Sequence, residues 1–199
     1  MGKNFSLNNV SKKRKENDFY ETPFSMTEQL LKAHYFGSFN SVLEPACGNG
    51  AIVKVLQTFF NEVHCYDITE GIDFFDEKQR YDYIITNPPY SSSFNWIKKC
   101  KEVATKKFAL LLPLSYLHGK KRHDEIWMDK TYPLTNVYVF TRYPMLGDKL
   151  RDDGKYRTGM QVYAWYIWDK LQGTTNKRKS ITVVDWIDNN AYVDNTKIG

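Results

Sequence analysis

A short apolar run that ends in a glycine-containing turn constrains the fold of this chain more than any other feature. The run Val42-Leu43-Glu44-Pro45-Ala46-Cys47-Gly48-Asn49-Gly50-Ala51 is typical of a buried strand that turns tightly into a helix. Apolar residues then recur at helical spacing, at Ile52, Val53, Leu56, Phe59 and Phe60. Gly48 and Gly50 permit positive φ and close backbone approach, and Asn49 is placed to cap the helix. Such a unit cradles ligands in many α/β proteins, although the spacing here is not the GxGxxG of dinucleotide sites.

A second predicted strand, Glu62 to Asp67, follows this helix and ends in a carboxylate. Asp67 lies about 20 residues beyond the glycine turn, where an acidic residue binds ribose hydroxyls in folds of this type. A solvated loop aspartate is the alternative interpretation. The pattern therefore makes Asp67 a candidate ribose ligand.

The tetrapeptide Asn87-Pro88-Pro89-Tyr90 follows the apolar run Tyr83-Ile84-Ile85-Thr86. Both prolines lack an N–H donor, fix their own φ and push the preceding residue toward extended geometry. The Asn87 side-chain oxygen and the Pro88 carbonyl are then placed to accept hydrogen bonds from one amino group. The alternative is a strand-ending turn, which such dipeptides often form.

The remaining periodicities predict alternating helices and strands. A capping box at Ser25-Met26-Thr27-Glu28 predicts a helix to about Tyr35, and Ser93 is placed to cap a helix with Ile97, Cys100, Val103 and Ala104 on one face. The predicted strands are Ser41–Pro45, Glu62–Asp67, Tyr81–Asn87, Phe108–Leu112, Leu134–Phe140 and Val162–Trp168, with a short third element at Asp73-Phe74. This order predicts a doubly wound sheet whose last strands form an antiparallel hairpin, with ligands bound at the carboxyl ends of the parallel strands.

Length and composition predict one domain spanning residues 1–199 of the 199-residue chain. Cys47, Cys65 and Cys100 lie in apolar patterns and are predicted to be reduced and mostly buried. Scattered histidines and the lack of CxxC pairs predict no metal site. No apolar run approaches the roughly 18 to 20 residues of a membrane span, so a cytoplasmic protein without a membrane partner is expected.

The net charge of +5 is modest, but the basic residues come in three runs, at residues 11–15, 119–123 and 177–179. Any single run is typical of a solvated face. Three runs with aromatic residues nearby favour a polyanionic partner, with residues 1–17 as a basic N-terminal arm.

Two of these motifs together resemble a known family. Glu44-Pro45-Ala46-Cys47-Gly48-Asn49-Gly50, followed by Asn87-Pro88-Pro89-Tyr90, is similar to the S-adenosylmethionine-dependent methyltransferases that modify amino groups, above all the small phage and mobile-element DNA adenine-N6 enzymes. Asp18-Phe19-Tyr20-Glu21-Thr22-Pro23 and the late strand Gly159–Trp168 resemble further segments of that family. The resemblance covers roughly residues 16 to 168. It implies a class I, Rossmann-like fold with a mostly parallel, seven-stranded sheet.

The resemblance also implies S-adenosyl-L-methionine as cofactor and assigns its contacts. Asp67 would bind the ribose, Asp73 and Phe74 the adenine, and Glu44 would orient the turn or reach the methionine ammonium through water. The remaining predicted cofactor contacts, which line or cap the methionine end, are Tyr20, Thr22, Pro23, Ala46, Gly48, Gly50 and Asn87.

For the acceptor, the resemblance implies catalysis by Asn87, Pro88 and Tyr90. Two hydrogen bonds, to the Asn87 side-chain oxygen and the Pro88 carbonyl, would localise the lone pair of the adenine N6. In duplex DNA the base must be flipped out, at a cost of a few kcal/mol, and Tyr90 would stack on it. Tyr143 is the candidate for a second covering ring, with Phe140 as the other candidate and turn packing as the alternative role of Tyr143.

The segment 143–159 is long and polar, and loops of such length are uncommon unless they are functional or disordered. It is predicted to contact nucleic acid, most simply double-stranded DNA, through Lys155 and Arg157, with Tyr143 and Lys121 as further nucleic-acid contacts. Residues 170–199 form a C-terminal appendage, in which Thr182–Ile187 predicts an edge strand or a docking tail.

Two other classes of function remain open. RNA adenine-N6 and protein glutamine methyltransferases use a similar Asn-Pro-Pro-Tyr, because a glutamine amide is also a planar, delocalised nitrogen. Alternatively, the chain is a non-catalytic nucleic-acid-binding subunit that has kept the fold. Intact Gly48, Asp67, Asn87, Pro88 and Tyr90 argue against such decay.

Overall fold

The computed structural model describes residues 21–37, 40–141, 162–170 and 181–187. These residues build one seven-stranded sheet in the order β2-β1-β3-β4-β6-β5-β7. The strands are β1 Ser41–Glu44, β2 Glu62–Cys65, β3 Tyr81–Thr86, β4 Ala104–Pro113, β5 Leu134–Phe140, β6 Tyr163–Asp169 and β7 Val183–Ile187. The helices are α1 Phe24–Ala33, α2 Ala51–Phe59, α3 Ser93–Val103 and the single turn α4 Lys120–Arg122. Five short turns complete the elements: η2 Ile68–Glu70, η3 Phe74–Asp76, η4 Tyr90–Ser92, η5 Leu114–Leu117 and η6 His123–Trp127.

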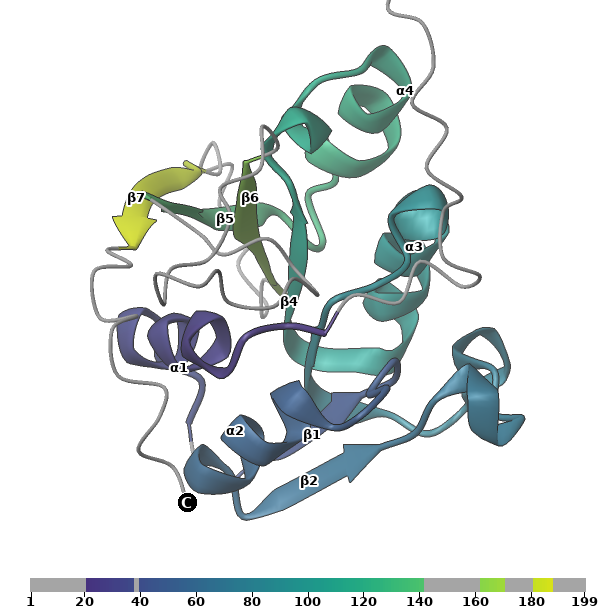
Figure 1. Ribbon diagram of the computed structural model, residues 1–199. Helices are drawn as coiled ribbons and strands as arrows, with labels where there is room; N and C mark the ends of the chain where they lie inside the picture. The colour runs from purple at the N-terminus through teal and green to yellow at the C-terminus, as the bar shows by residue number, and fades with distance from the viewer. Residues whose placement is uncertain (1–20, 38–39, 142–161, 171–180, 188–199) are drawn as a thin grey trace, which may run out of the picture.

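Helices cover both faces of the sheet, as the doubly wound prediction requires. Figure 1 shows α1 and α2 on one side and α3 on the other. The apolar cluster under α1 and α2 includes Met26, Leu30, Ile52 and Leu56, all buried. The cluster under α3 includes Trp96, Ile97, Cys100 and Val103. The sheet therefore has no solvent-facing side along its centre, which explains the fully apolar run Phe108–Leu112 within β4.

The parallel part and the antiparallel hairpin are both confirmed. The strands β2, β1, β3 and β4 are mutually parallel, while β6 runs antiparallel to both β4 and β5. The side chains of β6 alternate between the two apolar clusters. Trp168 stacks on Phe108 at 4.7 Å between ring centroids, whereas Trp165 donates its indole N–H to the Met26 carbonyl across the other face, at 2.9 Å.

The strand count matches the prediction, but one strand is a different segment. The expected third element at Asp73-Phe74 is not a strand: Asp73 caps the short turn η3 by accepting a hydrogen bond from the Phe75 amide. The seventh strand is instead β7, which pairs in parallel with β5 at the far edge. Of the two alternatives for Thr182–Ile187, the edge strand is therefore correct.

The structure corrects three predicted helix caps and the predicted burial of one cysteine. Pro23 is the N-cap of α1, so Ser25 lies inside the helix and there is no capping box, and α1 ends at Ala33 rather than near Tyr35. Gly50, not Asn49, is the N-cap of α2, because the backbone there adopts φ 80°, which favours glycine. Ser92 precedes α3, and Ser93 is its first residue. Cys100 is buried as expected and Cys47 is partly buried, but Cys65 is exposed because β2 is an edge strand.

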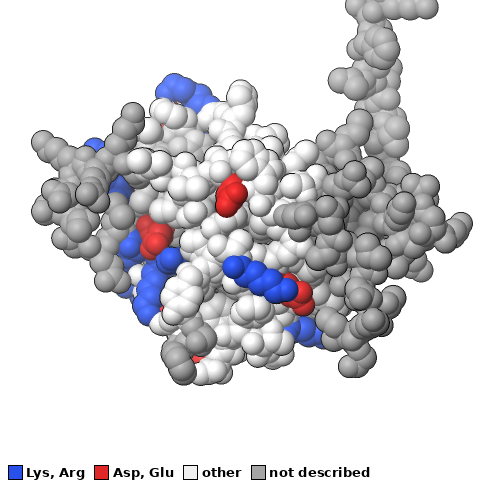
Figure 2. Space-filling model, turned by 90° about the vertical axis from the view of Figure 1, so that its left-hand side faces the viewer, with Lys and Arg blue, Asp and Glu red and all other residues white. Residues whose placement is uncertain are grey.

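Among the described residues, no helix has the length and apolar character needed to cross a bilayer. In Figure 2, which turns the face with β7 and α1 toward the viewer, the described residues are mostly white, and several basic residues with an acidic one gather on the left.

Candidate active site

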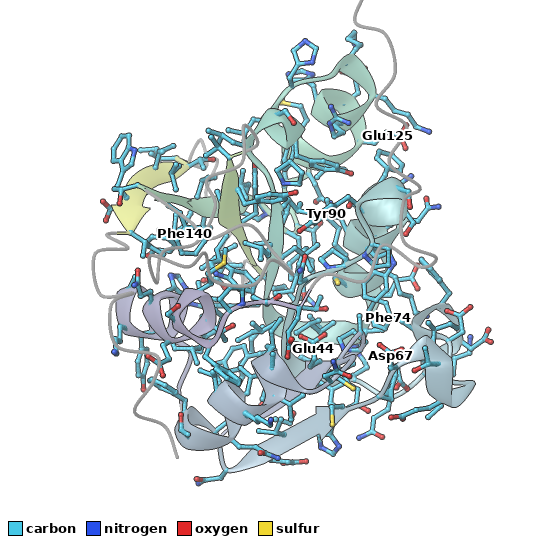
Figure 3. All side chains as sticks on the ribbon, viewed as in Figure 1. Glu44, Asp67, Phe74, Tyr90, Glu125 and Phe140 are labelled. Carbon is cyan, nitrogen blue, oxygen red and sulfur yellow. The ribbon has the colours of Figure 1, made fainter. Side chains whose placement is uncertain are left out.

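Two of the predicted site residues, Glu44 and Asn87, lie at the carboxyl edge of neighbouring parallel strands. Glu44 ends β1, and Asn87 directly follows β3, its hydrogen-bonded parallel neighbour. Neighbouring parallel strands that run in the same direction deliver their end residues to the same edge. Figure 3 shows Glu44, Asp67, Phe74 and Tyr90 on this side of the molecule.

Glu44 is a fully buried carboxyl group in a polar network. Its Oε1 accepts hydrogen bonds from the Thr86 hydroxyl at 2.5 Å and from the Ala46 amide at 3.0 Å. Burial raises the pKa of Glu44 to about 8, against the smaller opposing effect of these two bonds, so the group is largely protonated at neutral pH. Its Oε2 is buried and has no hydrogen-bond partner among the described residues. A buried oxygen without a partner is costly, so the position suits an ammonium ligand, whose charge would favour loss of the Glu44 proton and pairing with Oε2.

Asp67 joins the glycine turn to the end of β2. Its Oδ2 accepts from the Gly48 amide at 3.0 Å, and its Oδ1 accepts from the amide and the hydroxyl of Thr69. Burial favours a raised pKa for Asp67, but these hydrogen bonds outweigh it and lower the pKa, so the group is an anion. A carboxylate has about four acceptor positions, and these bonds use three of them. The remaining position, on Oδ2, suits a ribose hydroxyl.

The residues predicted to bind the adenine lie at η3. Further apolar side chains lie near them in the sequence. Phe74 is almost fully buried and packs on Trp96, with ring centroids 4.7 Å apart. The neighbouring Phe75 is 40% exposed. Ile68, the first residue of η2, and Ile72, which lies just after that turn, are also exposed. No role is predicted for these three side chains from the sequence, although an isoleucine directly after the carboxylate Asp67 is a readable signal.

Asn87 contacts Thr22, a residue 65 positions earlier in the chain. The Asn87 amide donates from Nδ2 to the Thr22 hydroxyl oxygen at 3.0 Å, and Thr22 itself is buried. Pro23 follows as the N-cap of α1 and fixes the backbone there. The bond occupies one end of the amide and thereby sets the direction in which the other end, Oδ1, faces. Thr22, predicted only as a cofactor contact, thus also orients Asn87.

The double proline leads into α3 through a hydrogen-bonded turn. The Ser92 amide donates to the Pro89 carbonyl at 3.1 Å, and the Ser93 hydroxyl donates to the Tyr90 carbonyl at 3.0 Å. The turn is thus closed by the carbonyls of Pro89 and Tyr90 rather than by that of Pro88. This arrangement is compatible with the predicted role of the Pro88 carbonyl as an acceptor.

Tyr90 has an aromatic neighbour, Tyr163, that was not predicted from the sequence. The rings of Tyr90 and Tyr163 lie 5.3 Å apart between centroids and are inclined by 35°. Tyr163 begins β6, opposite Pro113 at the end of β4, and the predicted strand Val162–Trp168 already contained it. Phe140 is wrong as a covering ring, because it is buried in the core under α1, away from Tyr90 (Figure 3).

The remaining predicted residues divide into two groups. Lys121 is described: its ammonium lies 4.5 Å from the centre of the Phe94 ring, at the start of α3. Tyr20, Tyr143, Lys155 and Arg157, together with the basic runs 11–15 and 177–179, lie outside the described residues. Their roles stay predictions. Within the described ranges, no cluster of three or more His, Cys, Asp or Glu side chains could hold a metal ion.

Comparison with known proteins adds one curated relative. The chain is 28% identical over 104 residues to a malonyl-[acyl-carrier protein] O-methyltransferase of Calditerrivibrio nitroreducens. The match covers 45% of this chain and 41% of the relative, so the chain spans less than half of that protein. No protein-family model matches the chain.

Solved structures share the fold over most of the chain. A protein of Listeria monocytogenes assigned to the class I S-adenosylmethionine-dependent methyltransferases superposes with a TM-score of 0.55 at 10% identity, over 82% of this chain and 63% of its own. The methyltransferase subunit of a type I restriction-modification system from Streptococcus thermophilus gives 0.54 at 12% identity, over 87% and 51%. A 23S rRNA methyltransferase gives 0.53 at 12% identity, over 80% and 72%. The chain therefore has the fold of class I S-adenosylmethionine-dependent methyltransferases.

Proposed function

We propose that this protein transfers a methyl group from S-adenosyl-L-methionine to the exocyclic N6 of adenine in DNA, with the target base flipped out of the helix. One observation carries the proposal: Asn87, which opens the Asn-Pro-Pro-Tyr turn after β3, is held by Thr22 at the carboxyl edge, where the parallel neighbour β1 leads into the glycine turn. An amide oxygen held in place next to an aromatic ring is suited to a flat amine.

The residues of the glycine turn fit the proposed cofactor. Glu44 offers its buried Oε2, which has no hydrogen-bond partner among the described residues, to the methionine ammonium, and Asp67 offers one acceptor position to a ribose hydroxyl. Ile68 and Phe75 offer exposed apolar surface to the adenine, beside the predicted contacts Asp73 and Phe74. When bound, S-adenosylmethionine supplies an electrophilic methyl group.

The chain contributes orientation and hydrogen bonding to the acceptor. Asn87 Oδ1 and the Pro88 carbonyl accept the two amino protons of adenine, which localises the nitrogen lone pair toward the methyl group. The methylated nitrogen then releases a proton to water, so no dedicated base is required. Correct placement of two reactants can contribute on the order of 7 to 11 kcal/mol, which makes rigid support of Asn87 by Thr22 important.

The test is a methyl-transfer assay with labelled S-adenosylmethionine on unmethylated duplex DNA, followed by nucleoside chromatography. We expect the label in N6-methyladenine. Label in RNA or in protein glutamine, with none in DNA, would contradict the proposed acceptor and leave the cofactor assignment standing.

A thermal shift with the cofactor separates an enzyme from a non-catalytic subunit. A ligand at 100 times its dissociation constant stabilises the folded state by about 2.7 kcal/mol, which is readily measured. The absence of both label and shift would overturn the proposal.

A further inference from the structure

A group of cationic and aromatic side chains lies beyond Tyr90 and includes Lys121, but none of its members contacts the proposed cofactor or the target amine. Phe94 and Lys98 are one helical turn apart on α3, and Lys121 and Arg122 belong to α4. Tyr116 comes from η5, directly after β4. We call these residues the cation–aromatic ridge: Phe94, Lys98, Tyr116, Lys121 and Arg122.

The cations of the ridge are packed against rings. The ammonium groups of Lys98 and Lys121 lie 4.7 and 4.5 Å from the centre of the Phe94 ring. The Arg122 guanidinium lies 4.5 Å from the Tyr116 ring and also donates from Nε to the His118 carbonyl, at 2.7 Å. Such contacts hold long side chains in place, so less conformational entropy is lost when they bind an anion.

The ridge is built at the same edge of the sheet as the methyl-transfer site. The helix α3 starts three residues after Tyr90, and η5 starts where β4, the parallel neighbour of β3, ends. In Figure 3, Tyr90 lies between Glu125, which pairs with the ridge residue Lys98, and the group Glu44, Asp67 and Phe74. The ridge and the glycine turn are therefore on opposite sides of Tyr90.

This placement fits the geometry of the proposed reaction, on which the inference rests. In an in-line transfer the acceptor nitrogen approaches the methyl group from the side away from the donor. A donor held by Glu44 and Asp67 leaves the side of α3 and α4 for the polymer that carries the acceptor base. We propose that the cation–aromatic ridge binds the phosphodiester backbone of the nucleic acid next to the acceptor nucleotide.

One acidic residue pairs with a ridge cation and gives the proposal a sharp test, and a second pairs with the lysine next to the ridge. Glu125 pairs with Lys98 at 2.6 Å, and Asp124 pairs with Lys120 at 2.5 Å. A phosphate that binds Lys98 must compete with the Glu125 carboxylate. Removing that carboxylate should therefore strengthen nucleic-acid binding, whereas removing a ridge cation should weaken it.

The experiment measures binding of the full chain to a fluorescently labelled, unmethylated duplex by anisotropy between 50 and 200 mM salt. Each phosphate contact contributes about 0.9 to the slope of log affinity against log salt. We expect Lys121→Gln to reduce the magnitude of the slope by about 0.9 and Glu125→Gln to increase it by a similar amount. At 0.1 M salt, one such contact corresponds to about an eightfold change in affinity relative to 1 M salt. All positions changed are exposed, so folding is checked by an unchanged melting temperature.

Lys32→Gln is the matched control, because Lys32 is an exposed lysine that pairs with Glu28 on α1, outside the ridge. A slope for Lys121→Gln equal to that of the control, or weaker binding by Glu125→Gln, would overturn the proposal.

Methyl transfer by the wild type on the same duplex separates this proposal from the proposed function. Labelled adenine with unchanged slopes would contradict the ridge and leave the proposed function standing. The expected slopes without label would leave the ridge standing and contradict adenine in duplex DNA as the acceptor. Binding only to single-stranded RNA, with a slope change of about 0.7 per contact, would leave the ridge as the binding surface and make RNA its partner.

Discussion

The two ends of the candidate site differ in how the chain builds them. The residues of the cofactor end come from one strand–turn–helix–strand unit. Within it, Glu44 accepts a hydrogen bond from the Ala46 amide and Asp67 accepts one from the Gly48 amide. The acceptor end is assembled from distant segments: Thr22 meets Asn87, and Tyr163 meets Tyr90. A local site can be inferred from a motif, whereas a composite one depends on which strands and helices become neighbours.

The difference also extends to charge. Burial keeps Glu44 largely protonated, and hydrogen bonds keep Asp67 an anion, so two carboxyl groups in one small unit have opposite protonation states. On the acceptor side, the charges belong to lysines and an arginine that lie against rings. Variants at the two ends should therefore separate cofactor binding from acceptor binding.

Asn87→Ala should have the largest effect and should act on the acceptor end alone. Loss of one preorganised hydrogen-bonding group at a reacting centre costs on the order of 10²- to 10³-fold in turnover. We expect at least that loss in labelled methyl transfer, with the thermal shift by S-adenosylmethionine retained. Full activity of the variant would show that Asn87 has no catalytic role.

Tyr90→Ala should follow, with an effect on the acceptor rather than on the cofactor. Stacking of a base on an aromatic side chain contributes about 1 to 3 kcal/mol, or roughly 5- to 150-fold in affinity for the flipped base. Tyr90→Phe serves as the control because it retains the ring. Tyr163→Ala should give a smaller loss in the same direction, since Tyr163 supports the Tyr90 ring. Equal kinetics for Tyr90→Ala and Tyr90→Phe would exclude stacking.

Variants of Thr22 test whether this predicted cofactor contact also orients Asn87 at the acceptor end. Thr22→Val removes one hydrogen bond of about 0.5 to 1.5 kcal/mol without changing the shape, so we expect kcat to fall roughly 2- to 12-fold. Thr22→Ser keeps the hydroxyl and should restore most of the rate. If Thr22 acts only as a cofactor contact, Thr22→Val will raise the KM for S-adenosylmethionine and leave kcat unchanged.

Glu44 should give the smallest effect on rate but a distinct dependence of stability on pH. Its pKa rises from 4.5 in the ordinary state to about 8 in the folded protein, so the folded state retains a proton that the unfolded state releases. The contribution of Glu44 to stability is therefore full below pH 4.5 and declines as the pH rises to about 8. Glu44→Gln, which carries no titrating proton, should abolish this slope in melting temperatures measured without cofactor. Parallel curves for the two proteins would show that Glu44 is ionised in the fold.

The sequence indicated most of the strands and the cofactor end, because apolar periodicity and glycine turns reflect local sterics. It was less accurate where local signals had competitors. Ser25 and Asn49 looked like helix caps, but proline geometry at Pro23 and a left-handed backbone at Gly50 set the two helix starts. The Asp73-Phe74 element became a turn because the Asp73 side chain bonds the following backbone in place of a neighbouring strand.

By itself, the sequence determined a doubly wound sheet, the glycine turn, the carboxylate of Asp67 and the position of Asn87 after a buried strand. Only the tertiary structure decided that β7 completes the sheet, that Thr22 orients Asn87, and that Tyr163 rather than Phe140 faces Tyr90. The physical reason is the range of the interactions. Backbone conformation and periodic burial are encoded within a few residues. Pairing of strands and contact between side chains remote in sequence depend instead on the packing of the whole sheet.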